Sequence, residues 1–147
     1  MKANNVFEFV VQNLGFLKHV PGLPHIFDGY LRLWTYCRHA DLFDYFDRLE
    51  DEFLSWDNTS VSIHKYGGLQ FNVGDKEVGH LHSNGLLDVA LNRQIKEMLS
   101  LEGRVNDHHL FKKSGWISFY MRSHDDEAYA IKLLQLGYAL KNRTVSS

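Results

Sequence analysis

The residues best suited to chemistry lie between Gly79 and Asp88. His80 and His82 are two positions apart, and Asp88 follows six positions after His82. Because the side chains of a strand alternate between its two faces, His80 and His82 point to the same side. A turn at 83–85 returns the chain and brings Asp88 within pairing distance. An acid beside a histidine fixes its tautomer, as a general base or a metal ligand requires, so this segment predicts a site.

The length of the turn decides which residues share a face. If 83–85 forms a three-residue loop, His80 lies opposite Asp88 and Leu81 lies opposite Leu87. If Asn84–Gly85 forms a two-residue turn, His80 lies opposite Val89 and Asp88 moves to the other face. The three-residue loop separates polar from apolar side chains better. We therefore expect both histidines and the acid on one face and the leucines in the core.

Two further segments supply candidates for the same site. His108 and His109 come before the last predicted strand and can bring another imidazole toward the sheet, and we take His109 as the site member. Arg122, which follows that strand, or Arg93 could stabilise an anionic oxygen, and Arg122 is included in the set. The catalytic set predicted from the sequence is then His80, His82, Asp88, His109 and Arg122.

This site has three competing interpretations: catalytic, metal-binding and structural. The catalytic set requires no cofactor, but His80, His82 and Asp88 could instead bind a divalent metal ion. The other interpretation is structural: the histidines lie on the solvent face of a half-exposed sheet, and Asp88 is a surface ion-pair partner.

The hydrophobic pattern predicts an α+β fold. Apolar residues at helical spacing predict helices over 5–19 and 41–56. The segment 25–39 fits a helix or a turn, and the segment 75–77 fits a solvated turn. Alternation then gives a four-stranded meander, and one more strand lies between two later helices. We expect N-terminal helices, an antiparallel five-stranded sheet and the two later helices packed on one of its faces. The strands are expected at 60–64, 70–73, 77–82, 86–91 and 116–121, and the later helices at 92–102 and 123–140.

Length and composition indicate one soluble domain. The 147 residues are 44% hydrophobic and 23% charged, enough for one core, with a helical part at 1–57 and an α+β part at 60–140. The 16 basic and 18 acidic residues give a net charge of −2, which argues against a nucleic-acid partner. The apolar run at 6–11 is too short to span a membrane, so no membrane partner is expected. These features leave the oligomeric state open.

Cysteine usage bears on the compartment. Cys37 is the only cysteine, so the chain cannot form an internal disulfide. This fits a reducing, cytoplasmic location. We expect Cys37 to be a small buried apolar residue.

Several short motifs, in order, resemble a known family. Glu77-Val78-Gly79-His80-Leu81-His82, then Asp88, the pair His108-His109, Ser114-Gly115-Trp116 and the closing segment from Leu133 to Tyr138 are similar to the small "luciferase domain" proteins of bacteria and fungi. The resemblance covers roughly 60–138. The fungal members oxidise a hydroxylated α-pyrone luciferin with dioxygen and have no known flavin or nucleotide requirement.

The resemblance implies a function for the same residues. A histidine at His80 or His82, oriented by Asp88 and accompanied by His109, would deprotonate an enol-like substrate so that the anion can react with oxygen. The expected function is a small cofactor-independent oxidase or oxygenase acting on an enolisable or phenolic small molecule. The alternatives are a non-catalytic module that binds a small molecule or a partner, and a mononuclear metal-binding protein.

Overall fold

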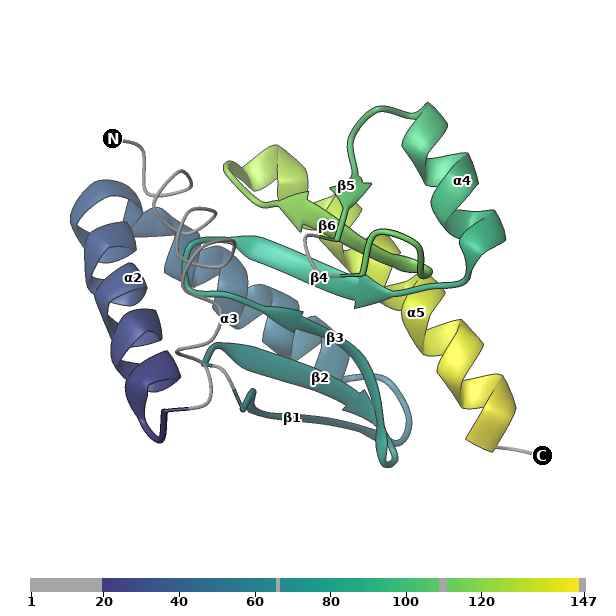
Figure 1. Cartoon of the computed structure of the whole chain (residues 1–147), viewed down its shortest axis with the longest axis horizontal. Coiled ribbons are helices and arrows are strands. Elements are labelled where there is room, and N and C mark those ends of the chain that lie inside the picture. The colour runs from purple at the N-terminus through teal and green to yellow at the C-terminus, as the bar shows by residue number, and fades with distance from the viewer. Residues whose placement is uncertain (1–19, 66, 109–110, 146–147) are drawn as a thin grey trace.

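The computed structural model describes residues 20–65, 67–108 and 111–145 (Figure 1). The helix predicted over 5–19 and the candidate His109 lie outside these residues. The helices are α2 (Leu23–His39), α3 (Asp41–Leu54), α4 (Arg93–Leu101), the 3-10 helix η2 (His124–Asp126) and α5 (Glu127–Val145). The strands are β1 (Thr59–Ile63), β2 (Leu69–Val73), β3 (Lys76–Leu81), β4 (Leu86–Ala90), β5 (Asn106–Asp107) and β6 (Trp116–Tyr120).

The strands form one antiparallel sheet in the order β1-β2-β3-β4-β6-β5. The α+β class and the four-stranded meander are therefore confirmed. The sheet has six strands rather than the predicted five, because Asn106 and Asp107 pair with Ser118 and Ile117 of β6. Two residues are too few to show an alternating pattern, so this short strand is set by its partner and not by its own sequence.

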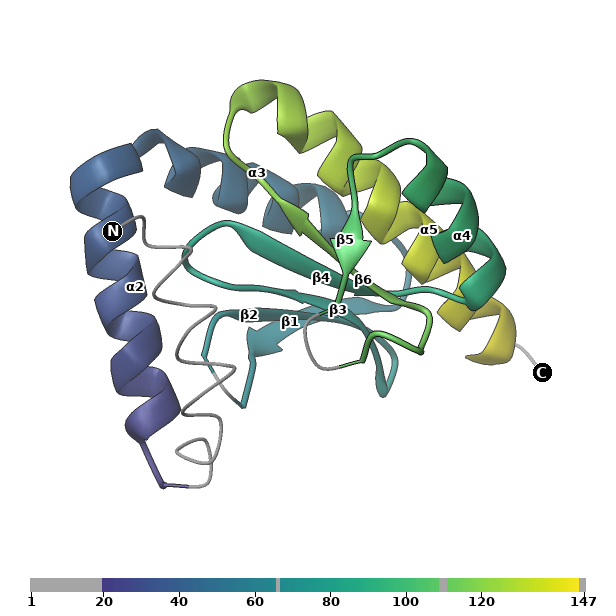
Figure 2. The same ribbon diagram turned by 45° about the horizontal axis from the view of Figure 1, so that its top comes forward.

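Helices cover one face of the sheet and leave the other for polar residues. In Figure 1, α3 and α5 lie behind the sheet, and Figure 2 shows the same layering from a view tilted by 45°. The two later helices contribute to the same core, as predicted: α5 contacts β2, β3 and β4, and α4 lies against β6 and adds Leu99. Helix α3 packs beside α5. The α3 residues that face the core are Leu42, Phe46, Leu49 and Phe53, spaced as an amphipathic helix requires.

Helix α2 stands at the side of the sheet (Figure 1). Its buried Leu31 contacts Leu86 at the start of β4. Cys37 is exposed, so the prediction that it is buried is wrong: α2 packs through a narrow contact and leaves most of its surface to solvent. In the described part of the chain, no helix combines the length and the apolar character needed to cross a membrane.

Candidate active site

The turn between β3 and β4 has the predicted three-residue form. His80 pairs with Asp88 and Leu81 pairs with Leu87. The loop is closed by the backbone N–H of His82, which donates to Leu86 O, and by the N–H of Gly85, which donates to His82 O. Leu81 and Leu87 are buried in the core, so the polar side chains of these strands share the opposite face.

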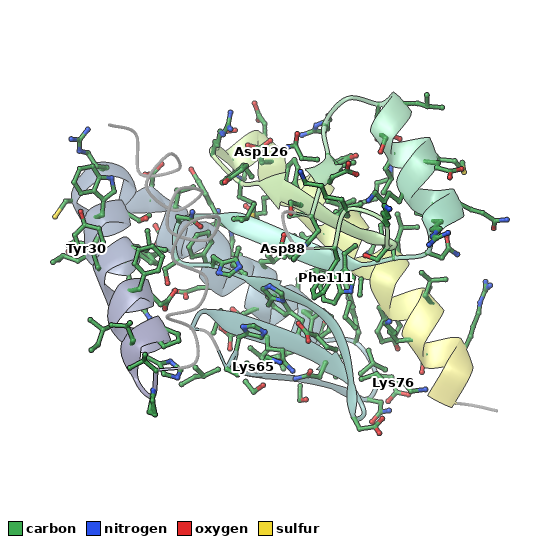
Figure 3. All side chains as sticks on the ribbon, in the orientation of Figure 1. Tyr30, Lys65, Lys76, Asp88, Phe111 and Asp126 are labelled. Carbon is green, nitrogen blue, oxygen red and sulfur yellow. The ribbon has the colours of Figure 1, made fainter. Side chains whose placement is uncertain are left out.

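Asp88 is the centre of the polar cluster on that face. Its side chain is 0% exposed. Its Oδ2 atom lies 3.2 Å from His80 Nε2, 3.3 Å from His82 Nε2 and 3.5 Å from His108 Nε2. Its Oδ1 atom accepts a hydrogen bond from the Ser118 hydroxyl on β6. Figure 3 labels Asp88 on β4, between the strands that supply these partners.

These partners keep Asp88 ionised despite its burial. Burial alone would raise the pKa of the carboxyl group, but hydrogen bonds from His108, His80 and His82 outweigh it and hold the pKa well below its usual value. An ionised carboxylate can only accept hydrogen bonds. Each imidazole that contacts Asp88 therefore turns a protonated Nε2 toward it.

The tautomer of His108 is fixed independently. The backbone N–H of Phe111 donates to His108 Nδ1 at 3.2 Å, so Nδ1 carries the lone pair and Nε2 carries the proton. His108 is 2% exposed, and its ring stacks on that of Phe111 with centroids 5.0 Å apart. His108 is thus a neutral hydrogen-bond donor to Asp88.

A β-bulge adds Glu77 to the cluster. Phe71 pairs with Gly79 and Asn72 with Glu77, which leaves Val78 as an extra residue in β3. In an unbroken strand, residues three positions apart face opposite sides, but the bulge turns Glu77 to the side of His80. Glu77 Oε1 lies 2.7 Å from His80 Nδ1. The prediction of a solvated turn at 75–77 is therefore wrong for Glu77, which is half-buried in β3.

His80 is held between two carboxylates. Burial alone would lower its pKa, but hydrogen bonds to Asp88 and Glu77, together with their charges, raise it to about 9. The pKa of Glu77 shifts the other way: burial would raise it, but the hydrogen bond and charge of His80 lower it. At neutral pH the centre of the site is an imidazolium flanked by two anions.

His64 also belongs to the site, although it is not in the set predicted from the sequence. It follows β1, is 4% exposed, and its ring stacks on that of His80 with centroids 4.2 Å apart and planes inclined by 13°. Burial, and then the positive charge of His80, lower the pKa of His64 to about 4, so it is neutral at pH 7. The available signal was the alternation of Ser60, Ser62 and His64, which predicts one shared face.

Arg122 lies apart from the rest of the predicted set. Arg122 is exposed, its guanidinium lies 5.3 Å from the centre of the Tyr120 ring, and its backbone N–H donates to Asp126. These contacts hold it at the end of β6, and among the described residues its side chain makes no hydrogen bond or ion pair with a histidine. His109 lies outside the described residues, and its neighbour His108 supplies the additional imidazole.

Two groups of three residues could hold a metal ion by the proximity of their ligand atoms. They are His64, Glu77, His80 and His80, Asp88, His108, with the ligand atoms of each group within 4.8 Å of one another. His108 thus takes the place of His82 in the set predicted from the sequence. Hydrogen bonds already occupy these ligand atoms. His108 Nε2 carries a proton toward Asp88, and both ring nitrogens of His80 contact carboxylates. A metal ion would have to displace these protons.

Comparison with known proteins identifies the segment that holds most of this site. A family model described as "Luciferase domain" matches residues 75–137. No curated protein and no solved structure matched the chain. The matched segment includes His80, His82, Asp88 and His108, whereas His64 lies before it. The resemblance of this chain to the luciferase-domain family is therefore confirmed over the residues that build the centre of the site.

Proposed function

We propose that the protein is a small enzyme that removes a proton from an enolisable or phenolic small molecule at the cluster around Asp88. The observation that carries this proposal is the contact of one fully buried carboxylate with the Nε2 atoms of His80 and His82, at 3.2 Å and 3.3 Å. A buried anion that orients an imidazole is the arrangement a general base requires.

His82 is the proposed base. Because ionised Asp88 only accepts hydrogen bonds, it holds the His82 proton on Nε2 and leaves the lone pair on Nδ1. Nδ1 is then the atom that takes the proton from the substrate. As the ring becomes an imidazolium, the carboxylate of Asp88 stabilises its charge.

His80 is the proposed counter-charge for the substrate anion. Its ring is perpendicular to that of His82, with centroids 5.0 Å apart, and the carboxylates of Glu77 and Asp88 keep it protonated. A fixed positive charge in a site that excludes water favours the formation of an enolate or phenolate beside it. This role, given to Arg122 in the sequence analysis, now falls to a buried residue.

The family resemblance adds the second substrate. The carbanion or phenolate formed at His82 donates electrons to dioxygen, a carbon–oxygen bond forms, and oxygen is reduced to the peroxide level. We place this chemistry in the cytoplasm, on a small-molecule substrate, because the single cysteine and the slightly acidic charge balance fit that setting.

The experiment measures proton removal separately from oxygen uptake. Purified protein is incubated in D2O, without oxygen, with a panel of 1,3-dicarbonyl compounds and hydroxylated pyrones, and loss of the acidic C–H signal is followed by NMR. The same panel is then tested in air with an oxygen electrode. We expect catalysed exchange for at least one compound, reduced about 100-fold or more by His82→Gln or Asp88→Asn.

The control is His124→Gln. His124 is exposed on η2 and contacts Glu127, away from the sheet face. This variant should exchange the substrate C–H at the wild-type rate. If His82→Gln and His124→Gln both keep the full rate, His82 is not the base and the proposal is abandoned.

Metal binding is the second candidate function, favoured by the two groups with ligand atoms within 4.8 Å. Titration with Co²⁺, followed by its visible absorption, distinguishes coordination from hydrogen bonding. Tight stoichiometric binding that is lost in His80→Gln and kept in His124→Gln would favour a metal protein. Binding no stronger than in His80→Gln would favour the hydrogen-bonded cluster.

A further inference from the structure

A buried lysine connects α4 to the segment that carries His108. Lys96 is 8% exposed, although its side chain carries a charge. Its Nζ atom donates to Lys112 O at 2.8 Å and to Ser114 O at 3.2 Å. It also lies 2.8 Å from Asp107 Oδ1. The ammonium group therefore has acceptors for all three of its protons.

These acceptors lie at both ends of the connection between β5 and β6. Asp107 ends β5 and directly precedes His108, and Ser114 lies just before β6. Beyond Ser114, a Cβ atom on Gly115 would lie 2.0 Å from Leu91 O, so the connection passes close against the end of β4. Lys96 thus links the two ends of the β5–β6 connection.

The energetic cost of this lysine calls for an explanation. Burying an ammonium group is unfavourable unless hydrogen bonds replace its hydration. A methionine at the same position on α4 would avoid that cost. What the charge adds is direction, because one ammonium group binds acceptors at both ends of the β5–β6 connection.

We propose that Lys96 is a positioning residue that holds the β5–β6 connection where His108 Nε2 reaches Asp88. The chain of contacts is short. Lys96 binds Asp107, the next residue is His108, and His108 Nε2 lies 3.5 Å from Asp88 Oδ2. The inference adds a residue to the site described above, but it concerns the position of a histidine and can be tested without any substrate.

The test follows the His108 ring by NMR in protein labelled with ¹⁵N-histidine. In the wild type, we expect a protonated Nε2, an unprotonated Nδ1 and slow exchange of the Nε2 proton with water. Lys96→Met should make that exchange about tenfold faster or more, because the loop opens locally more often. Lys96→Arg, which keeps the charge and several donors, should recover most of the protection.

Lys112→Met is the matched control. The Lys112 side chain is exposed, and only its backbone carbonyl accepts from Lys96, so this variant removes a lysine and keeps the contact. It should leave the His108 signals unchanged. His108 signals and exchange in Lys96→Met like those of the wild type would overturn the proposal, even if the melting temperature fell. If Lys96→Met does not fold, Asp107→Asn decides: faster exchange supports the proposal and unchanged exchange overturns it.

Discussion

His80 and Asp88 pair directly across β3 and β4, and their side chains meet with Nε2 3.2 Å from Oδ2. This contact links the register of the turn to the charge of the site. The register places both groups on the sheet face opposite α3 and α5. Because Asp88 is fully buried there, its charge requires hydrogen-bonding partners.

Asp88→Asn should strongly destabilise the fold. The amide cannot balance the His80 charge, and it turns N–H groups toward imidazoles that also donate. Breaking a buried charge pair on one side costs about 3 to 5 kcal/mol of unfolding free energy. Urea unfolding measures the loss. Asp75→Asn, at an exposed turn before β3, is the control and should change the free energy by less than about 0.5 kcal/mol.

Glu77→Gln should lower the pKa of His80 from about 9 toward its ordinary value. In this variant the imidazolium of His80 loses the carboxylate that accepts a hydrogen bond from its Nδ1 atom at 2.7 Å, and it keeps its contact with Asp88. An NMR titration of the His80 ring measures the change. Glu97→Gln, at an exposed position on α4, should leave the titration as in the wild type. An unchanged His80 pKa in Glu77→Gln would contradict the role of the β-bulge.

Stability should be greatest near pH 6.5 and fall on both sides. The folded pKa of His80 is raised to about 9, so its contribution is complete below about 6.5 and is lost as the pH rises through 9. The loss on the alkaline side is roughly 3 kcal/mol, from 1.36 kcal/mol per pKa unit.

On the acidic side, stability is lost as the pH falls. The folded pKa of His64 is lowered to about 4, so its contribution is present above about 6.5 and is lost as the pH falls through 4. The lowered pKa of Asp88 extends this loss to still lower pH. Urea unfolding between pH 4 and 10 measures the free energy of unfolding on both sides of pH 6.5. In His80→Gln, the decrease of this free energy above pH 6.5 should be smaller. A wild-type free energy that stays constant from pH 6.5 to 9 would contradict the assignment of His80.

Gly79→Ala should destabilise the sheet at the site. A Cβ atom there would lie 2.3 Å from Asp88 O, so β3 and β4 would have to separate. We expect a cost of about 1 to 3 kcal/mol, measured by thermal or urea unfolding. Gly29→Ala is the control, because its Cβ meets no atom within 4 Å on α2. It should raise stability by about 0.5 to 1 kcal/mol, since alanine favours the helix.

The sequence by itself determined the local part of this site. The period of two placed His80 and His82 together. The three-residue loop placed Asp88 opposite His80, because a two-residue turn would have placed Asp88 on the face of the core leucines. The apolar stripe from Leu42 to Phe53 likewise predicted α3 correctly. Such patterns depend only on neighbours along the chain, so they can be read without knowing the fold.

Only the tertiary structure decided the rest. Glu77 joins the site because Val78 turns into the core beneath α5, where Gly137 leaves room for its side chain. His64 reaches it through the pairing of β1 with β2 and of β2 with β3, His108 through the pairing of β5 with β6 and of β6 with β4, and Lys96 through the packing of α4. Each of these placements depends on how the segments pack against one another. That packing is a property of the whole core and not of any single segment.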